Sequence, residues 1–135
     1  MATTVPYIGG SAMQTLTRVL NQETIEDRKI DQLDLSLVKE KLCFPVERGG
    51  HGWTKDHADE VEKQYRMFLK LHSRYVKAGL VPTVDVDTMW HMHILFTFEY
   101  IKDCQDVFGH YFHHSPFIGT HDEYMESFGR NAKMT

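Results

Sequence analysis

Residues 54–79 have the sequence TKDHADEVEKQYRMFLKLHSRYVKAG. Side chains that suit a buried face recur here every three or four positions, which is the spacing of one side of an α-helix. These positions are Val61, Tyr65, Phe68, Leu69, His72, Tyr75 and Val76. Thr54 is a suitable N-cap, and Gly79 ends the pattern. The sequence therefore predicts a long amphipathic helix near Asp56 to Lys77.

A second long helix is predicted directly after the first. The link between them contains Gly79 and Pro82, which interrupt helical structure. Asp85 then offers a cap for a segment that runs to Val107, just before Gly109. Because the link is short, we expect the two long helices to pack as an antiparallel hairpin.

Three shorter helices are predicted outside this hairpin, at Ser11 to Asn21, at Asp34 to Leu42 and from Thr120 onward. Residues 43–53 hold one proline and three glycines without any periodicity, which is typical of a loop. The two helices before that loop should cover the hairpin, since it cannot bury both of its apolar faces alone. The predicted fold is mainly α: a single-domain helical bundle over residues 1–135 with a long antiparallel helix hairpin.

Composition limits the class of protein. The chain has 135 residues, 41% of them hydrophobic and 25% charged, as in an ordinary globular domain. With 15 basic and 19 acidic residues it lacks the basic stripe that nucleic-acid binding requires. The start of the chain lacks a signal sequence, and no apolar run approaches the ~18 residues of a membrane span, so we expect a cytoplasmic protein. Two cysteines exclude a disulfide framework and a four-cysteine zinc site.

Histidines are concentrated in the second half of the chain. Of the nine, five fall between His91 and His114. Imidazole is a common ligand of transition metals, and a carboxylate often completes such a site. Asp87 and His91 are four positions apart and would share one helix face, and the turn-rich segment 109–116 could bring His114, or its neighbour His113, to them. The candidate ligands for Fe(II) or Zn(II) are Asp87, His91, His93 and His114.

His93 is difficult to place in the same site as His91. Two positions on a helix lie roughly 200° apart around its axis, so a regular helix cannot easily direct both side chains to one ion. His93 instead shares a stripe with Met89, Trp90 and Tyr100, which should face the hairpin or line a pocket. His93 is therefore predicted to be either a further ligand or an acid–base group, and Tyr100 is a second candidate catalytic residue.

Structural roles are the alternative for each of these residues. An aspartate and a histidine four positions apart are often a surface ion pair, and a histidine on an apolar stripe is often a core residue. The spacing of Tyr65, Phe68, Tyr75 and Trp90 indicates core positions. Cys104 is predicted to be a small buried hydrophobic residue rather than a thiolate.

The second half of the chain resembles the glycine-rich domain-containing protein-like family. The residues that carry this resemblance are Asp87-Thr88-Met89-Trp90-His91-Met92-His93-Ile94-Leu95, Tyr100, Asp103-Cys104, Phe108-Gly109 and His113-His114-Ser115-Pro116-Phe117. Weaker similarity extends back through Tyr65-Arg66 and Val81-Pro82-Thr83, so the resemblance covers about 33–129. It implies importance for Asp103 and Cys104 besides the candidate ligands, but it names no reaction.

The chain departs from that pattern at one place. Where the family is expected to have Asp-Thr-Arg, this sequence has Phe96-Thr97-Phe98, in which two charged groups are replaced by apolar ones. If those charges bind substrate in relatives, the resemblance implies a different or more apolar substrate here.

Two functions are compatible with these residues. The first is a small metal-dependent enzyme, an oxidoreductase or a hydrolase, that acts on a small molecule or peptide at a histidine and carboxylate site. The second is a non-catalytic module in which a structural zinc or a histidine network supports protein–protein interaction. A catalytic metal keeps an open coordination position, whereas a structural zinc is held by four protein ligands. This difference distinguishes the two functions.

Overall fold

The computed structural model describes residues 22–77 and 79–115. Its helical elements are α2 (Ile25–Asp31), α3 (Ser36–Cys43), the short 3₁₀ turn η1 (Val46–Arg48), α4 (Lys55–Arg74), α5 (Val84–Leu95) and α6 (Thr97–Phe108). No strand occurs in these two ranges, so the predicted all-α fold is confirmed. The helices predicted at Ser11 to Asn21 and from Thr120 lie outside the described residues.

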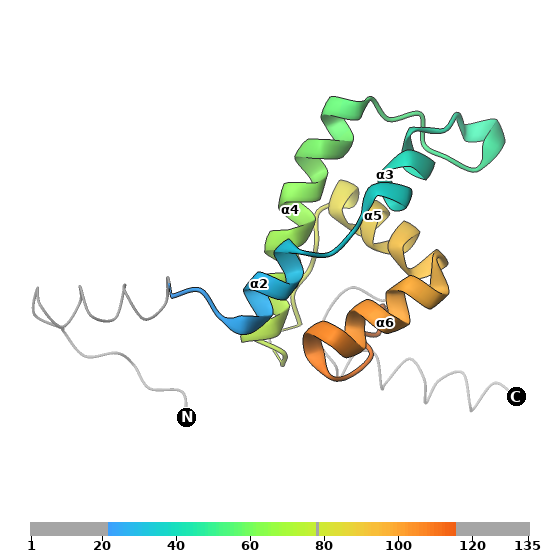
Figure 1. Cartoon of the computed structure of the whole chain (residues 1–135). Coiled ribbons are helices and arrows are strands. Elements are labelled where there is room, and N and C mark those ends of the chain that lie inside the picture. Colours follow the sequence, from blue (N-terminus) through green and yellow to red (C-terminus); the bar gives the residue numbers. More distant parts are fainter. Residues whose placement is uncertain (1–21, 78, 116–135) are drawn as a thin grey trace, which may run out of the picture.

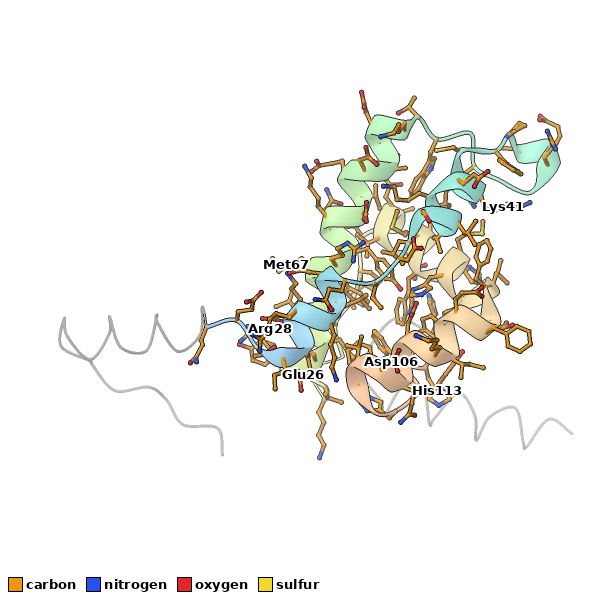
Figure 2. The ribbon with its side chains drawn as sticks, viewed as in Figure 1. Glu26, Arg28, Lys41, Met67, Asp106 and His113 are labelled. Atoms are coloured by element: carbon orange, nitrogen blue, oxygen red, sulfur yellow. The ribbon has the colours of Figure 1, made fainter. Side chains whose placement is uncertain are left out.

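The helices pack as a bundle around α4 and α5. In Figure 1, α4 is the long green helix, and α2, α3 and α5 each pack against it. α5 also contacts α3 and α6, and α2 reaches α6. The most deeply buried side chains come from all of these helices: Ile30, Leu35, Leu42, Val61, Tyr65, Met89 and Tyr100. Charged side chains such as Glu26, Arg28 and Asp106 lie on the outside in Figure 2.

Capping residues set the ends of the longer helices. Thr54 accepts a hydrogen bond from the backbone N–H of His57 at the start of α4, as its sequence predicts. α5 starts earlier than predicted, because Thr83 rather than Asp85 caps it. Gly109 ends α6 with a left-handed backbone, φ 71°, the conformation for which glycine is favoured.

The predicted second long helix is interrupted at Phe96. That residue has φ −82° and ψ 73°, which ends α5 and starts α6 in a new direction. The prediction of one helix from Asp85 to Val107 is therefore wrong at this point. Neither glycine nor proline is present there, so the sequence gives no local signal. The break follows from packing, because it lets Tyr100 and Cys104 of α6 bury against the core while the side chain of Phe96 also contacts it.

α2 was missed by the sequence analysis because it has only seven residues and few apolar side chains. Thr24 and Asp27 form a capping box at its start. At its other end, the guanidinium of Arg66 from α4 donates to the carbonyl oxygens of Ile30 and Leu33. Arg74 also pairs with the buried carboxylate of Asp27. Burial raises the pKa of this group, but the backbone N–H of Thr24 and the guanidinium of Arg74 together hold it below its usual value. α2 is thus fixed by side chains of α4.

No helix within the described residues is both long enough and apolar enough to cross a membrane.

Candidate functional site

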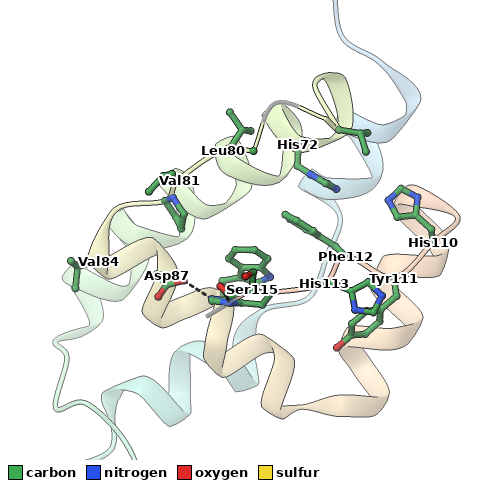
Figure 3. Close-up of a pocket in the computed structure, with 15 residues that line it drawn as sticks. His72, Leu80, Val81, Val84, Asp87, His110, Tyr111, Phe112, His113 and Ser115 are labelled. Atoms are coloured by element: carbon green, nitrogen blue, oxygen red, sulfur yellow. Dashed lines mark hydrogen bonds and ion pairs between the residues drawn. The ribbon is translucent and has the colours of Figure 1, made fainter. Parts of the chain in front are cut away.

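A cleft of about 410 Å³ opens between the end of α4, the link to α5 and the segment that follows α6. In Figure 3 the residues on its upper side are His72, Leu80 and Val81, and those on its opposite side include Asp87 of α5. The 109–115 segment closes the third side, with Phe112 pointing into the space. The cleft therefore depends on two parts of the chain that α6 separates in sequence: the region from His72 to Trp90 and the segment 109–115.

Two of the predicted metal ligands, Asp87 and His114, line this cleft, and a third, His91, lies next to His114. The imidazole Nε2 of His114 is 2.5 Å from the carboxylate Oδ1 of Asp87. Its Nδ1 is 3.1 Å from the carbonyl oxygen of Ser115. The ring of His91, one turn after Asp87 on α5, is 5.6 Å from the ring of His114. The 109–115 segment thus folds back onto α5, and His114, rather than His113, contacts Asp87.

In their observed positions these side chains do not form a complete metal-binding site. Within residues 22–77 and 79–115, no three histidine, cysteine or acidic side chains are arranged to hold an ion. His114 contacts Asp87 directly, and an ion with ligands at about 2 Å needs more space between them. His91 is exposed beside this pair.

His93 is separated from the other candidates, as a regular helix requires. It is buried, and both of its ring nitrogens have protein partners: Nδ1 is 2.7 Å from the hydroxyl of Tyr65, and Nε2 is 2.8 Å from the carboxylate of Asp103. Burial raises the pKa of Tyr65, so its hydroxyl stays protonated and can donate to Nδ1. Nε2 then donates to Asp103. His93 thus lies in a buried hydrogen-bond chain with Tyr65 and Asp103, and its role as a ligand or acid–base group stays a prediction.

Tyr100 is also inside the protein rather than in the cleft. Its hydroxyl accepts a hydrogen bond from Trp90 Nε1 at 2.9 Å and donates to the carbonyl oxygen of Phe112. Burial raises the pKa of this hydroxyl. Tyr100 therefore does not line the site in which a catalytic role was expected; it holds the backbone of the 109–115 segment.

Cys104 supports the same segment. Its sulfur accepts a hydrogen bond from the backbone N–H of Phe112 at 3.5 Å, and burial raises the pKa of the thiol. Both backbone groups of Phe112 are thus bound by α6, one by Cys104 and the other by Tyr100. The Phe112 ring packs between His72 and Trp90, with ring centroids 3.5 and 4.5 Å away respectively. These contacts give the cleft a fixed aromatic wall.

His72 belongs to the cleft, although sequence reasoning treated it as an ordinary helix residue. Its ring is buried, and burial is the main cause that lowers its pKa from 6.5 to about 4, with nearby His110 adding to the effect. The imidazole is therefore neutral at physiological pH. The spacing of α4 placed position 72 on the buried face, but it could not show that Phe112 would stack on this ring from 40 residues further on.

A family model described as UCP032817-like matches residues 28–129. This finding overturns the resemblance to the glycine-rich domain-containing protein-like family, which depended on short motifs around Trp90 and His113. Comparison with curated proteins and with solved structures gives no match.

Proposed function

Since the chain belongs to the UCP032817-like family, whose name carries no activity, we propose a function from the geometry of the cleft: it binds a small organic molecule with an apolar body. One observation carries this proposal. The cleft combines aromatic and aliphatic walls with polar side chains, among them His72, Asp87 and His114, and its volume of about 410 Å³ is in the range of small-molecule sites.

The charges of the lining residues support an uncharged or weakly charged ligand body. Among the described residues that line the cleft, no lysine or arginine occurs, and the one carboxylate, Asp87, is paired with His114. An anion with several charges, such as a nucleotide, would find no strong cationic partner here. Leu80, Val81 and Pro82 instead offer apolar surface.

The Asp87 and His114 pair supports an enzyme rather than a passive binder. A carboxylate that orients an imidazole is the arrangement used for proton transfer in many enzymes. With Asp87 on one ring nitrogen, the other nitrogen of His114 lies 3.1 Å from the carbonyl oxygen of Ser115, which a substrate group could replace. In this proposal His114 transfers a proton to or from the substrate, and Asp87 orients the ring of His114.

The test is a ligand screen by NMR with the full chain. We expect aromatic and aliphatic compounds to shift resonances of His72, Phe112 and His114 together. Val76→Trp should fill the cleft and abolish those shifts, since Val76 lines it and is half exposed. Val46→Trp is the matched control, because Val46 is exposed and does not line the cleft. Shifts that persist unchanged in Val76→Trp would place the binding elsewhere and refute the proposal.

A second candidate function is metal binding by Asp87, His91 and His114, with Fe(II) or Zn(II) as the ion. The observation that favours metal binding is that the rings of His91 and His114 lie 5.6 Å apart, next to the carboxylate of Asp87. The pair of Asp87 and His114 would have to open to admit the ion. Two histidines and one carboxylate leave positions for water or substrate.

Metal content of protein loaded with each ion tests this second candidate. His91→Ala and His114→Ala should each remove most of the bound metal, because two remaining ligands hold it weakly. His51→Ala, at an exposed position outside this group, should retain it. Full occupancy in both His91→Ala and His114→Ala would exclude the site. Bound iron with an open position favours an enzyme, whereas zinc that resists chelation favours a structural role.

A further inference from the structure

The ring of His72 has one buried nitrogen that no other described residue binds. The side chain is only 9% exposed, and its Nε2 is buried with no hydrogen-bond partner within residues 22–77 and 79–115. Phe112 covers one face of the ring at 3.5 Å, nearly parallel to it. Phe108 meets the ring edge to face at 5.1 Å. A buried polar atom in this position costs free energy unless something compensates for it.

The tautomer of His72 follows from which nitrogen is buried. A neutral imidazole carries one N–H and one lone pair. Buried N–H groups without a partner are rarer in proteins than buried acceptors without one. We therefore assign the lone pair to Nε2 and the proton to Nδ1. Because His72 lines the cleft and its Nε2 is inaccessible, Nδ1 is the nitrogen left to face a ligand there.

Aromatic rings gather next to this donor. Trp90 lies 4.5 Å from Phe112 and 4.1 Å from His114, measured between ring centroids. All three rings line the cleft together with His72. Flat apolar groups pack well on such a surface, since offset and edge contacts between rings are favourable.

We propose that the Nδ1–H of His72 is the recognition group of the cleft, and that its ligand is a planar aromatic molecule with an oxygen acceptor, either a carboxylate or a neutral carbonyl. This inference rests on the proposed function, because it names the class of molecule that the cleft binds. The aromatic part lies against Trp90 and Phe112, and the oxygen accepts the hydrogen bond from His72.

Three naphthalene probes test the proposal, with binding measured by NMR titration. They are 2-naphthoate, 2-naphthamide and 2-methylnaphthalene, which share a ring system and differ in the acceptor. We expect the first two to bind about fivefold more tightly than the third, the factor that one hydrogen bond contributes. Equal affinities for naphthoate and naphthamide identify a carbonyl oxygen as sufficient, whereas tighter naphthoate binding identifies a carboxylate.

The matched variants are His72→Phe and His51→Phe. His72→Phe keeps a flat ring against Phe112 but removes the N–H, so the fivefold preference for an acceptor should disappear. His51→Phe makes the same change at an exposed position that does not line the cleft, and it should leave all affinities unchanged. A second measurement needs no variant: ¹⁵N NMR of the histidine rings should show the proton of His72 on Nδ1.

The outcomes separate the two proposals. A preference for acceptors that survives in His72→Phe, or a His72 proton on Nε2, would overturn the role of His72 while leaving the cleft as a binding site. Equal affinities of all three probes for the unmodified protein would do the same. If none of the probes or screened compounds shifts the cleft resonances, the proposed function itself is wrong, and the role of His72 fails with it.

Discussion

The imidazole of His72 and the phenyl ring of Phe112 lie face to face, with ring centroids 3.5 Å apart and ring planes within 5° of parallel. This contact joins α4 to the 109–115 segment and excludes water from one side of the imidazole. A charged imidazole is poorly solvated in such a place, which is why burial lowers the pKa of His72 to about 4.

This pKa predicts how stability depends on pH. A histidine in the unfolded chain titrates near pH 6.5, so between pH 6.5 and about 4 the unfolded state binds more protons than the folded state. The contribution of His72 to the free energy of unfolding is therefore fully present above pH 6.5 and falls by about 3 kcal/mol as the pH decreases through this window. Urea unfolding at pH 7, 5.5 and 4.5 measures this fall in the free energy of unfolding. His72→Phe should lose this part of the pH dependence, and His51→Phe should keep it; equal slopes in both variants would contradict the assignment.

Replacement of His93 should destabilise the protein. His93→Ala leaves the hydroxyl of Tyr65 and the carboxylate of Asp103 without their partner in the interior and creates a cavity, so we expect a loss of about 3 kcal/mol. His93→Gln keeps a hydrogen-bonding group and should cost less. Thermal unfolding followed by circular dichroism measures both. His91→Ala, on the same helix but exposed, is the control and should change stability by less than about 0.5 kcal/mol.

Tyr100→Phe should loosen the wall of the cleft. The change removes only the hydroxyl, but it leaves the N–H of Trp90 and the carbonyl of Phe112 without this partner, at a cost of about 2 kcal/mol. Hydrogen exchange of the backbone amide of Phe112 should accelerate as well. Tyr111→Phe removes the same atom from a more exposed ring and should have little effect. Unchanged exchange at Phe112 in Tyr100→Phe would show that Tyr100 does not hold this segment.

Gly50→Ala should be strongly destabilising for a steric reason. A Cβ atom at this position would lie 2.1 Å from the carbonyl oxygen of Phe44 and 2.4 Å from that of Lys41, neither of which can move without the backbone. We expect a loss of about 3 kcal/mol in urea unfolding. Gly52→Ala is the comparison: its Cβ would meet nothing within 4 Å, and only its φ of 65° costs about 1 kcal/mol. Equal losses of stability in Gly50→Ala and Gly52→Ala would show that the backbone around position 50 shifts to make room for the added Cβ atom.

Local signals in the sequence predicted the parts of the fold that depend on a single helix. α4 follows from its apolar spacing and from Thr54, and the end of α6 follows from Gly109. The break at Phe96 and the helix α2 could not be predicted in this way. Both depend on contacts with distant residues, in the case of α2 on Arg66 and Arg74.

The candidate site was predicted in part, for similar reasons. The helical spacing of Asp87 and His91, and a return of the chain at His114, could be read from the sequence, and the structure brings Asp87 and His114 together. The same spacing indicated that His91 and His93 face different ways. The cleft beside them could not be foreseen, because its wall depends on how Tyr100 binds the backbone of Phe112.

The attachment of α2 by α4 has a consequence for the order of folding. A helix of seven residues is too short to be stable alone in water, where about 12 residues are needed. During synthesis α2 emerges from the ribosome before Arg66 and Arg74 do, so it lacks these partners at that stage. The first described helix in the sequence is therefore expected to form only after α4, and not in the order in which the two are synthesised.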